Sequence, residues 1–223
     1  MFNKFFNPEN PITRTLSHLF DLAVLNVLCL VFSLPVFTAG CAAAAAAAVC
    51  FHMIRDDYTS VWRTFWRAFK QNFRQATLIW LLTLALMALF GVDLWYFQAV
   101  QTFLSGTART VICCVFIFLL LSALLLYTYA IFMTALFENT VRTTLGNAVQ
   151  LSLRNPGRDL AVLAVDAVMV WIALYVPSMA PAAIIPLALL GFSLTIFLNC
   201  RILLPVFRPY LEEGGPDAGH EED

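Results

Sequence analysis

The feature that most restricts the fold of this chain is a series of long apolar segments, each of a length that suits a helix crossing a lipid bilayer. They lie at residues 19–37, 39–54, 76–99, 110–137, 159–176 and 182–204. A helix rises 1.5 Å per residue, so about 20 apolar residues span a hydrocarbon core of ~30 Å. The composition agrees, because 61% of the residues are hydrophobic and only 12% are charged. The sequence therefore predicts an all-α integral membrane protein, a single bundle of six transmembrane helices.

The second apolar segment differs from the others because seven consecutive alanines follow Cys41. Alanine is weakly hydrophobic, so such a helix inserts poorly alone, but its small side chains allow neighbouring helices to approach closely. We expect residues 39–54 to form a central span surrounded by protein. The six cysteines also lie inside apolar segments, without a Cys-x-x-Cys pair, and are expected to be buried thiols rather than metal ligands.

Two segments between the spans, residues 61–75 and 141–155, are amphipathic. In the first, a helical period separates aromatic from basic side chains. The residues predicted to contact a membrane interface or a partner are Trp62, Arg63, Phe65, Trp66, Arg67, Phe69, Lys70, Phe73 and Arg74. Such a helix suits the bilayer surface, where rings lie at headgroup depth and cations meet anionic lipids. The alternative is a helix that packs its apolar face on the protein itself.

The two amphipathic segments also resemble each other at an offset of 80 residues. Identical residues occur in the pairs Val61 and Val141, Thr64 and Thr144, Ala68 and Ala148, and Arg74 and Arg154. We interpret this as a duplication of a unit made of a span, an interfacial helix and a span, with both copies in the same orientation. Convergence of two amphipathic helices on one pattern is the alternative.

The distribution of basic residues predicts the orientation of the bundle. With six spans, twelve of the thirteen Lys and Arg side chains fall on one side, and only Arg109 falls on the other. The positive-inside rule makes the basic side cytoplasmic, which places both termini and both amphipathic helices there. Residues 209–223 hold six acidic side chains and are predicted to form a disordered tail.

Polar side chains inside the spans are costly in lipid and are therefore candidate functional residues. Those of the cytoplasmic half are Asp21, Asn26, His52, Asp166, Asn199 and Arg201. One interpretation is a proton or solute relay centred on Asp166, and the other is pairing within the protein, such as Asp166 or Asp21 with Arg201. Nucleophile-elbow, zinc-protease and phosphate-loop motifs are missing from the sequence, so we expect no enzyme, metal or cofactor. Lipid headgroups, rather than nucleic acid, are the expected phosphate partners.

Four short stretches carry a resemblance to a known family. They are Asn7-Pro8, Leu34–Gly40 (LPVFTAG), Phe69–Ala76 (FKQNFRQA), and Asn147-Ala148 followed by Leu151 and Arg154. Together they resemble the YesL-like bacterial membrane proteins, the domain of unknown function 624, up to about Arg208; the alanine run departs from that pattern. The resemblance implies a multi-pass protein of the bacterial plasma membrane, often encoded beside carbohydrate ABC-transporter genes and without an established activity.

Two functions are compatible with these observations. The first is a non-catalytic accessory membrane protein whose amphipathic helices contact anionic lipid headgroups or a partner. Only the resemblance links this function to carbohydrate uptake and to ABC-transporter subunits as partners. The alternative is a small-solute transporter or channel with its polar centre near Asp166.

Overall fold

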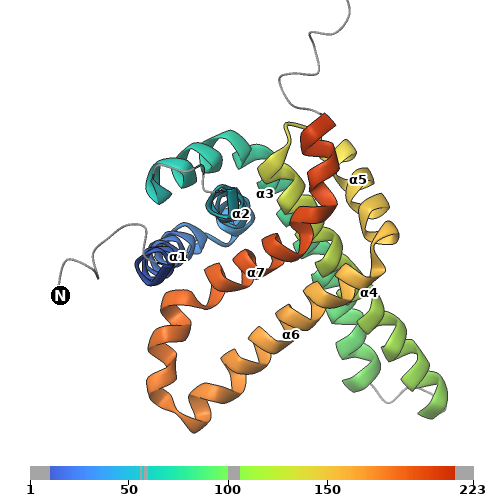
Figure 1. Ribbon diagram of the computed structural model, residues 1–223. Helices are drawn as coiled ribbons and strands as arrows, with labels where there is room; N and C mark the ends of the chain where they lie inside the picture. Colours follow the sequence, from blue (N-terminus) through green and yellow to red (C-terminus); the bar gives the residue numbers. More distant parts are fainter. Residues whose placement is uncertain (1–10, 56, 58–59, 100–105, 214–223) are drawn as a thin grey trace, which may run out of the picture.

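The computed structural model describes residues 11–55, 57, 60–99 and 106–213, and this part of the chain consists of helices joined by short connections, without a strand (Figure 1). The α-helices are α1 (Pro11–Ser33), α2 (Ala39–Arg55), α3 (Val61–Ala99), α4 (Gly106–Leu136), α5 (Val141–Arg154), α6 (Pro156–Met179) and α7 (Ile184–Glu213). Two 3-10 turns, η2 (Val36–Thr38) and η3 (Pro181–Ala183), join α1 to α2 and α6 to α7. Among the described residues, six helices, all but α5, are long and apolar enough to cross a membrane. The prediction of an all-α, multi-pass membrane protein is confirmed.

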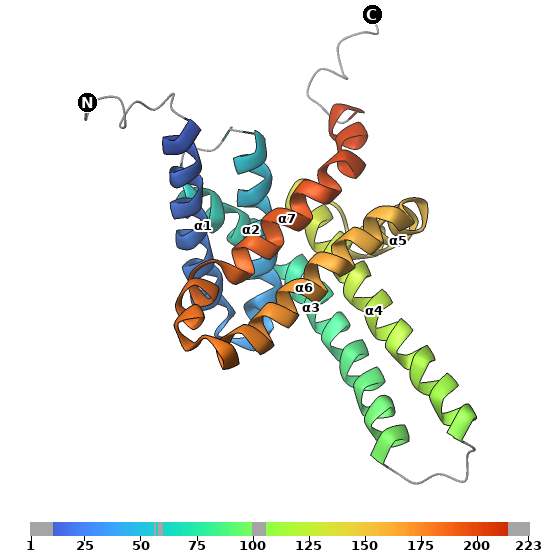
Figure 2. The ribbon, with the colours of Figure 1, turned by 60° about the horizontal axis from the view of Figure 1, so that its bottom comes forward.

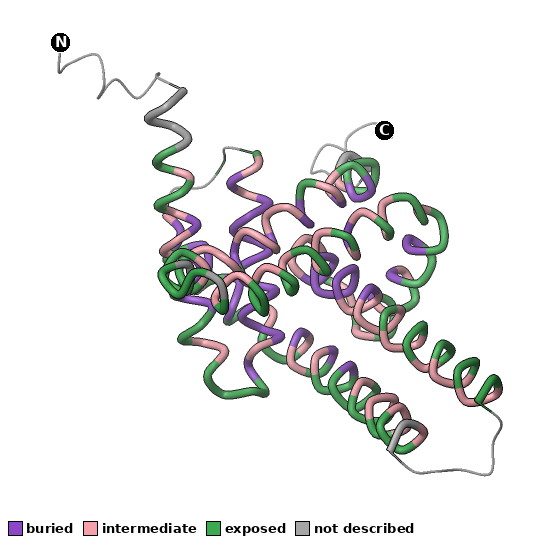
Figure 3. The backbone as a smooth tube through the Cα atoms, turned by 90° about the horizontal axis from the view of Figure 1, so that it is seen from below, coloured by how far each residue is buried: buried purple, intermediate pink, exposed green. Residues whose placement is uncertain are grey.

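The alanine-rich helix α2 forms the centre of the bundle. All of its residues from Gly40 to Phe51 are buried, whereas the apolar part of α6 is only 6% buried. Helices α1, α3, α4 and α7 all pack on α2. Figure 3 shows the buried positions concentrated where these helices meet. The burial of α2 and its four neighbours confirm the expectation of a central helix surrounded by protein. Its surface of alanine methyl groups allows these neighbours to approach closely.

Helices α2 and α3 cross at Gly40, where their backbones nearly touch. A Cβ atom at Gly40 would lie 2.3 Å from Cβ of Trp80 and 2.9 Å from the carbonyl oxygen of Ala76, so the crossing admits no side chain there. On one side of this contact, Nε1 of Trp80 donates a hydrogen bond to the Val36 carbonyl at 2.7 Å. On the other, Sγ of Cys41 donates to the Phe69 carbonyl at 3.1 Å.

Thr38 stabilises the end of α1 rather than the start of α2. Its hydroxyl oxygen lies 2.6 Å from the Phe32 carbonyl and 2.8 Å from the Pro35 carbonyl. The last carbonyls of a helix lack partners within the helix, and a hydroxyl in the following turn can satisfy them. The expected span 19–37 therefore ends earlier, at Ser33, and is followed by η2.

Helix α3 is a single helix of 39 residues, about 58 Å long at 1.5 Å per residue. This differs from the prediction of an interfacial helix at 61–75 followed by a separate span at 76–99. Neither glycine nor proline occurs near residue 75, and buried positions continue at helical spacing through Phe65, Phe69, Ala76 and Ile79. Figure 1 shows the first part of α3 curving past α2 before the second part runs beside α4.

Two pairs of helices diverge toward the end of the bundle opposite the start of α1, and the first part of α7 also packs on α1. Figure 2 shows the second part of α3 and the first part of α4 projecting together, while α6 runs beside the first part of α7 in another direction. The apolar parts of α3 and α4 are each only 11% buried. Their exposed leucine, valine and aromatic side chains form the surface that a membrane protein presents to lipid or to another membrane helix.

Helix α7 extends beyond the sixth predicted span of 182–204. It continues through Pro205 and Pro209 to Glu213, so residues 209–213, predicted as part of the disordered tail, are helical. The rest of that tail, 214–223, lies outside the described residues. Figure 2 shows the start of α1 and the end of α7 on the same side of the bundle, which we call the terminal side.

Candidate functional site

A cavity of about 580 Å³ lies between the two diverging helix pairs, within the apolar part of the bundle. Side chains from α1, α2, α3, α4, α6 and α7 line it, and most of them are apolar. The cavity is open on one side, because Leu30, Val170 and Phe192 in its lining are 48%, 57% and 43% exposed. Its volume falls within the range of sites that hold small organic molecules.

Asp166 and Asn199 form the polar centre of this cavity. Nδ2 of Asn199 on α7 donates a hydrogen bond to Oδ1 of Asp166 on α6 at 2.8 Å. Asn199 is only 4% exposed, and its Oδ1 atom has no hydrogen-bond partner among the described residues. Asp166 is only partly buried, so its carboxylate is the acceptor that the cavity offers to a ligand or helix with a donor.

The other four residues of the predicted intramembrane polar site lie elsewhere. Asp21 is half-buried on α1, and Arg201 is exposed on α7. Nδ1 of His52 lies 2.7 Å from Oδ1 of Asp57, in the connection that follows α2. Asp166 therefore pairs with Asn199 rather than with Arg201, and the structure brings only these two of the six predicted residues together.

Asn26 has a structural role that its position in the sequence did not reveal. Its Nδ2 donates to the Ala188 carbonyl at 2.6 Å, and its Oδ1 accepts from the backbone N–H of Ser193 at 2.8 Å. A side chain that enters the hydrogen-bond ladder of a helix can bend that helix. Figure 1 shows α7 turning sharply in its first half. The two contacts of Asn26 fall in the same part of α7. We attribute the bend to these contacts, together with Pro186 near the start of α7.

The nine residues predicted to contact an interface or a partner divide between two environments. Phe65 and Phe69 are buried at 0% and 8% exposure, and both rings pack against Phe32 of α1. Trp66 is half-buried, also against Phe32. The residues that are exposed on the outer side of α3 are Trp62, Arg63, Arg67, Lys70, Phe73 and Arg74. The helix thus packs much of its aromatic face on the protein, as the alternative interpretation held, and leaves a basic face with two exposed rings.

A hydrogen-bond network that sequence reasoning missed joins α4, α5 and α6. The Tyr129 hydroxyl donates to Oδ1 of Asp159 at 2.6 Å, and the Ser152 hydroxyl donates to Oδ2 of Asp159 at 2.7 Å. Asp159 stands in the first turn of α6, where the helix dipole also favours a negative charge. Only its place beside a helix N-terminus was visible in the sequence, because its two donors are distant in the chain.

The polar groups of the described residues do not form a metal site. No group of three His, Cys, Asp or Glu side chains lies close enough together to hold an ion in the part of the chain that the structure describes. The six cysteines are free thiols, four of them buried. The cavity and its Asp166–Asn199 pair are consequently the strongest candidate for a functional site within the bundle.

Comparison with known proteins tests the resemblance that the sequence motifs suggested. Residues 22–94 match the family described as "Protein of unknown function, DUF624". The DUF624 match covers most of α1, all of α2 and most of α3, and contains the Leu34–Gly40 and Phe69–Ala76 motifs. No curated protein and no solved structure matches the chain. The resemblance is thus confirmed for the part of the chain that holds the α2–α3 crossing.

Proposed function

We propose that this chain is a non-catalytic accessory protein of the bacterial plasma membrane that holds a transmembrane helix of a partner protein in the cavity beside Asp166. The single observation that carries the proposal is the open, apolar cavity, whose lining includes the hydrogen-bonded pair Asp166 and Asn199. Within the hydrocarbon region, a helix is the element that can dock on the open side of such a cavity without exposing its own backbone groups. A Ser, Thr, Asn or Lys side chain on that helix would donate a hydrogen bond to the carboxylate of Asp166.

The proposed orientation places both termini and the basic face of α3 in the cytoplasm. It rests on the excess of Lys and Arg on the terminal side. In this arrangement the exposed residues Arg63, Arg67, Lys70 and Arg74 meet anionic headgroups. Much of the aromatic face of this segment is packed on α1, so the contact with lipid is mainly electrostatic. The internal repeat, if α3 and α5 descend from one unit, places α5 on the same side.

The link to carbohydrate uptake comes from the YesL-like resemblance alone. On that basis, the proposed partner is a membrane subunit of an ABC transporter. The divergent helix pairs support a partner-binding role in general, because α6 leaves Val168, Val170, Trp171 and Leu174 more than half exposed. Exposed apolar side chains of this kind suit contact with lipid and contact with a second helix equally well, so they do not indicate where a partner binds. We therefore take the cavity as the proposed binding place.

Site-specific photocrosslinking in native membranes tests the proposal with a matched pair of positions on α6. Val170 lines the cavity, whereas Val168 is the same residue type, is similarly exposed (55% against 57%) and does not line the cavity. Positions two residues apart on a helix differ by about 200° around its axis, so the two probes point to different faces. We expect a protein adduct from position 170 and lipid adducts alone from position 168. Equal protein crosslinking at both positions, or none at position 170, would refute the cavity as the docking place.

The second candidate is a small-solute transporter, and the volume of the cavity around Asp166 is the observation that favours it. A relay across the bundle would require further polar groups near Asp166, but His52 and Asn26 have partners elsewhere. Flux into liposomes containing only the purified chain distinguishes the two functions. The accessory function predicts no flux; flux that is abolished by Asp166→Asn, in a variant that stays folded, would establish the transporter instead.

A further inference from the structure

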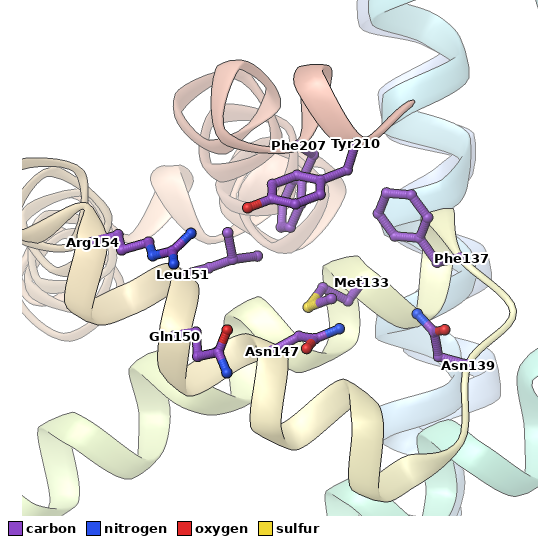
Figure 4. Close-up of a pocket in the computed structure, with 9 residues that line it drawn as sticks. All are labelled: Met133, Phe137, Asn139, Asn147, Gln150, Leu151, Arg154, Phe207 and Tyr210. Atoms are coloured by element: carbon purple, nitrogen blue, oxygen red, sulfur yellow. The ribbon is translucent and has the colours of Figure 1, made fainter. Parts of the chain in front are cut away.

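A second pocket, of about 270 Å³, lies at the terminal side between the end of α4, helix α5 and the end of α7 (Figure 4). It differs from the cavity around Asp166 because polar side chains make up five of its nine lining residues. They are Asn139 from the connection between α4 and α5, Asn147, Gln150 and Arg154 from α5, and Tyr210 from α7. Figure 4 shows the Arg154 guanidinium and the Tyr210 hydroxyl reaching toward the same space from α5 and α7.

The local sequence explains why α5 presents these groups. Thr144, Ala148, Leu151 and Ser152 form the buried face of the helix. Asn147, Gln150 and Arg154 are spaced by three and four residues, so they share a second face of α5 next to the buried one. The end of α7 borders that face, with Phe207 fully buried and Tyr210 exposed by 42%.

The five polar side chains have no hydrogen-bond or ion-pair partner among the described residues. This set includes a guanidinium with five N–H donors, three carboxamides and a phenol. No acidic side chain is part of the described lining. Glu138, the neighbour of Asn139, instead accepts a hydrogen bond from Gln71 of α3. The pocket therefore combines one uncompensated positive charge with several unused donors.

We propose that this pocket binds the phosphoryl group of a small organic phosphate ester. A phosphoryl group carries negative charge and presents several oxygens in a tetrahedral arrangement, which suits donors that arrive from three elements better than the two coplanar oxygens of a carboxylate do. The remaining lining is apolar and comes from Met133, Phe137, Leu151 and Phe207, so it accommodates the organic part of the ester. The phosphate monoester group is the same in the headgroup of phosphatidic acid and in a soluble phosphate monoester.

Binding to the full chain, purified in a neutral, phosphate-free detergent, tests the assignment and separates the two sources. Glycerol 3-phosphate represents the soluble ester, and short-chain phosphatidic acid in micelles represents the lipid. Glycerol and acetate are the comparison ligands. We expect at least one of the two esters to bind, and glycerol and acetate to bind at least tenfold more weakly, because they lack the charge or the tetrahedral oxygens. Binding of the soluble ester identifies a metabolite site, and binding of phosphatidic acid alone identifies a headgroup site.

Three variants decide whether binding occurs in this pocket. Arg154→Gln should weaken binding about tenfold or more, since it removes the charge-assisted contacts. Arg142→Gln changes an exposed arginine on the same helix that does not line the pocket, and it should leave affinity within about twofold of the original protein. Tyr210→Phe should cause a loss of about threefold to tenfold while keeping the ring. It also provides a test that does not depend on the folding of the Arg154 variant.

The proposal is overturned if neither ester binds, if acetate binds as tightly as the esters, or if Arg142→Gln weakens binding as much as Arg154→Gln. The last result would show attraction to the general positive charge of the surface rather than to a pocket. Unchanged binding by both Arg154→Gln and Tyr210→Phe in folded protein would place any ester elsewhere on the molecule. None of these outcomes depends on a partner in the cavity beside Asp166.

Discussion

Replacing Gly40 by alanine should destabilise the bundle more than any other single addition of a methyl group at a described glycine. The new Cβ would lie 2.3 Å from Cβ of Trp80 and 2.9 Å from the Ala76 carbonyl oxygen. Carbon atoms in favourable contact are about 3.5–4.0 Å apart, so α2 and α3 would have to separate by more than ~1 Å at the crossing. The Ala76 oxygen belongs to the helix backbone and cannot rotate away as a flexible side chain does.

The expected cost combines overpacking with the loss of two hydrogen bonds. Forcing an extra methyl group into a packed core typically costs about 1–3 kcal/mol. A separation of this size would also stretch the bond from Trp80 to Val36, now 2.7 Å, and the bond from Cys41 to Phe69, now 3.1 Å. Interhelical hydrogen bonds in membranes average about 0.6 kcal/mol each. The free energy of unfolding should therefore fall by about 2–4 kcal/mol.

Reversible denaturant unfolding in detergent micelles, followed by tryptophan fluorescence, measures this change. Gly91→Ala is the matched control, because Gly91 lies in α3 and a Cβ there meets nothing within 4 Å. That control should be neutral or stabilising by up to about 1 kcal/mol, since alanine favours helix more than glycine does. A Gly40→Ala protein within about 0.5 kcal/mol of the original would show that the α2–α3 crossing is not the tight contact described here.

Four further substitutions test other parts of the fold in the same unfolding assay. Asp159→Ala removes the acceptor shared by two hydroxyl donors and should cost about 1.5–3 kcal/mol, whereas Tyr129→Phe should cost about 1 kcal/mol; equal effects would contradict the shared acceptor. Asn26→Leu leaves the Ala188 carbonyl and the Ser193 N–H of α7 without their side-chain partner, so it should lower the free energy of unfolding by about 1–3 kcal/mol. An unchanged free energy of unfolding would contradict the structural role of Asn26. Lys70→Gln removes a cation that lies 5.0 Å from the ring centre of Trp66, and since the contact is exposed, a loss above about 1 kcal/mol would contradict this account.

The number of membrane helices could be predicted because the relevant physics is local. A span needs a certain length of apolar sequence, and that length is visible without knowledge of any contact. The central place of α2 could also be predicted, because a run of alanines such as Ala42–Ala48 is poorly suited to contact with lipid but well suited to contact with other helices. Burial of α2 confirms this expectation.

The partners of polar residues could not be predicted, because they depend on packing between distant segments. Asp166 and Asn199 are 33 residues apart in sequence, and Asn26 is 162 residues from Ala188. Periodicity shows which face of a helix a residue occupies, but not which helix will face it. The sequence therefore suggested a group of six polar residues, whereas the structure has one pair at the cavity and several unrelated contacts.

The amphipathic segment 61–75 shows how one pattern supports two environments. Aromatic side chains on one face and cations on the other are typical of a helix at the lipid surface, but the same face can pack on protein if a neighbour offers an aromatic surface. Phe32 of α1 provides that neighbour for Phe65, Trp66 and Phe69. Phe32 lies about thirty residues earlier in the chain, so the helical period of residues 61–75 could not predict which of the two environments the aromatic face occupies.

The family match has a structural explanation that limits what it implies about function. Its two motifs, Leu34–Gly40 and Phe69–Ala76, meet each other where α2 crosses α3, at Gly40 and Ala76 and through the bond between Cys41 and the Phe69 carbonyl. Those residues pack helices together, and Ala39 of the first motif also lines the cavity, as do Cys29, Leu30, Ser33, Ala43 and Trp80 elsewhere in residues 22–94. By contrast, Asp166, Asn199 and the phosphoryl-binding pocket all lie outside residues 22–94. The match therefore includes part of the cavity wall, whereas the polar side chains of the two proposed sites come from the α4–α7 half.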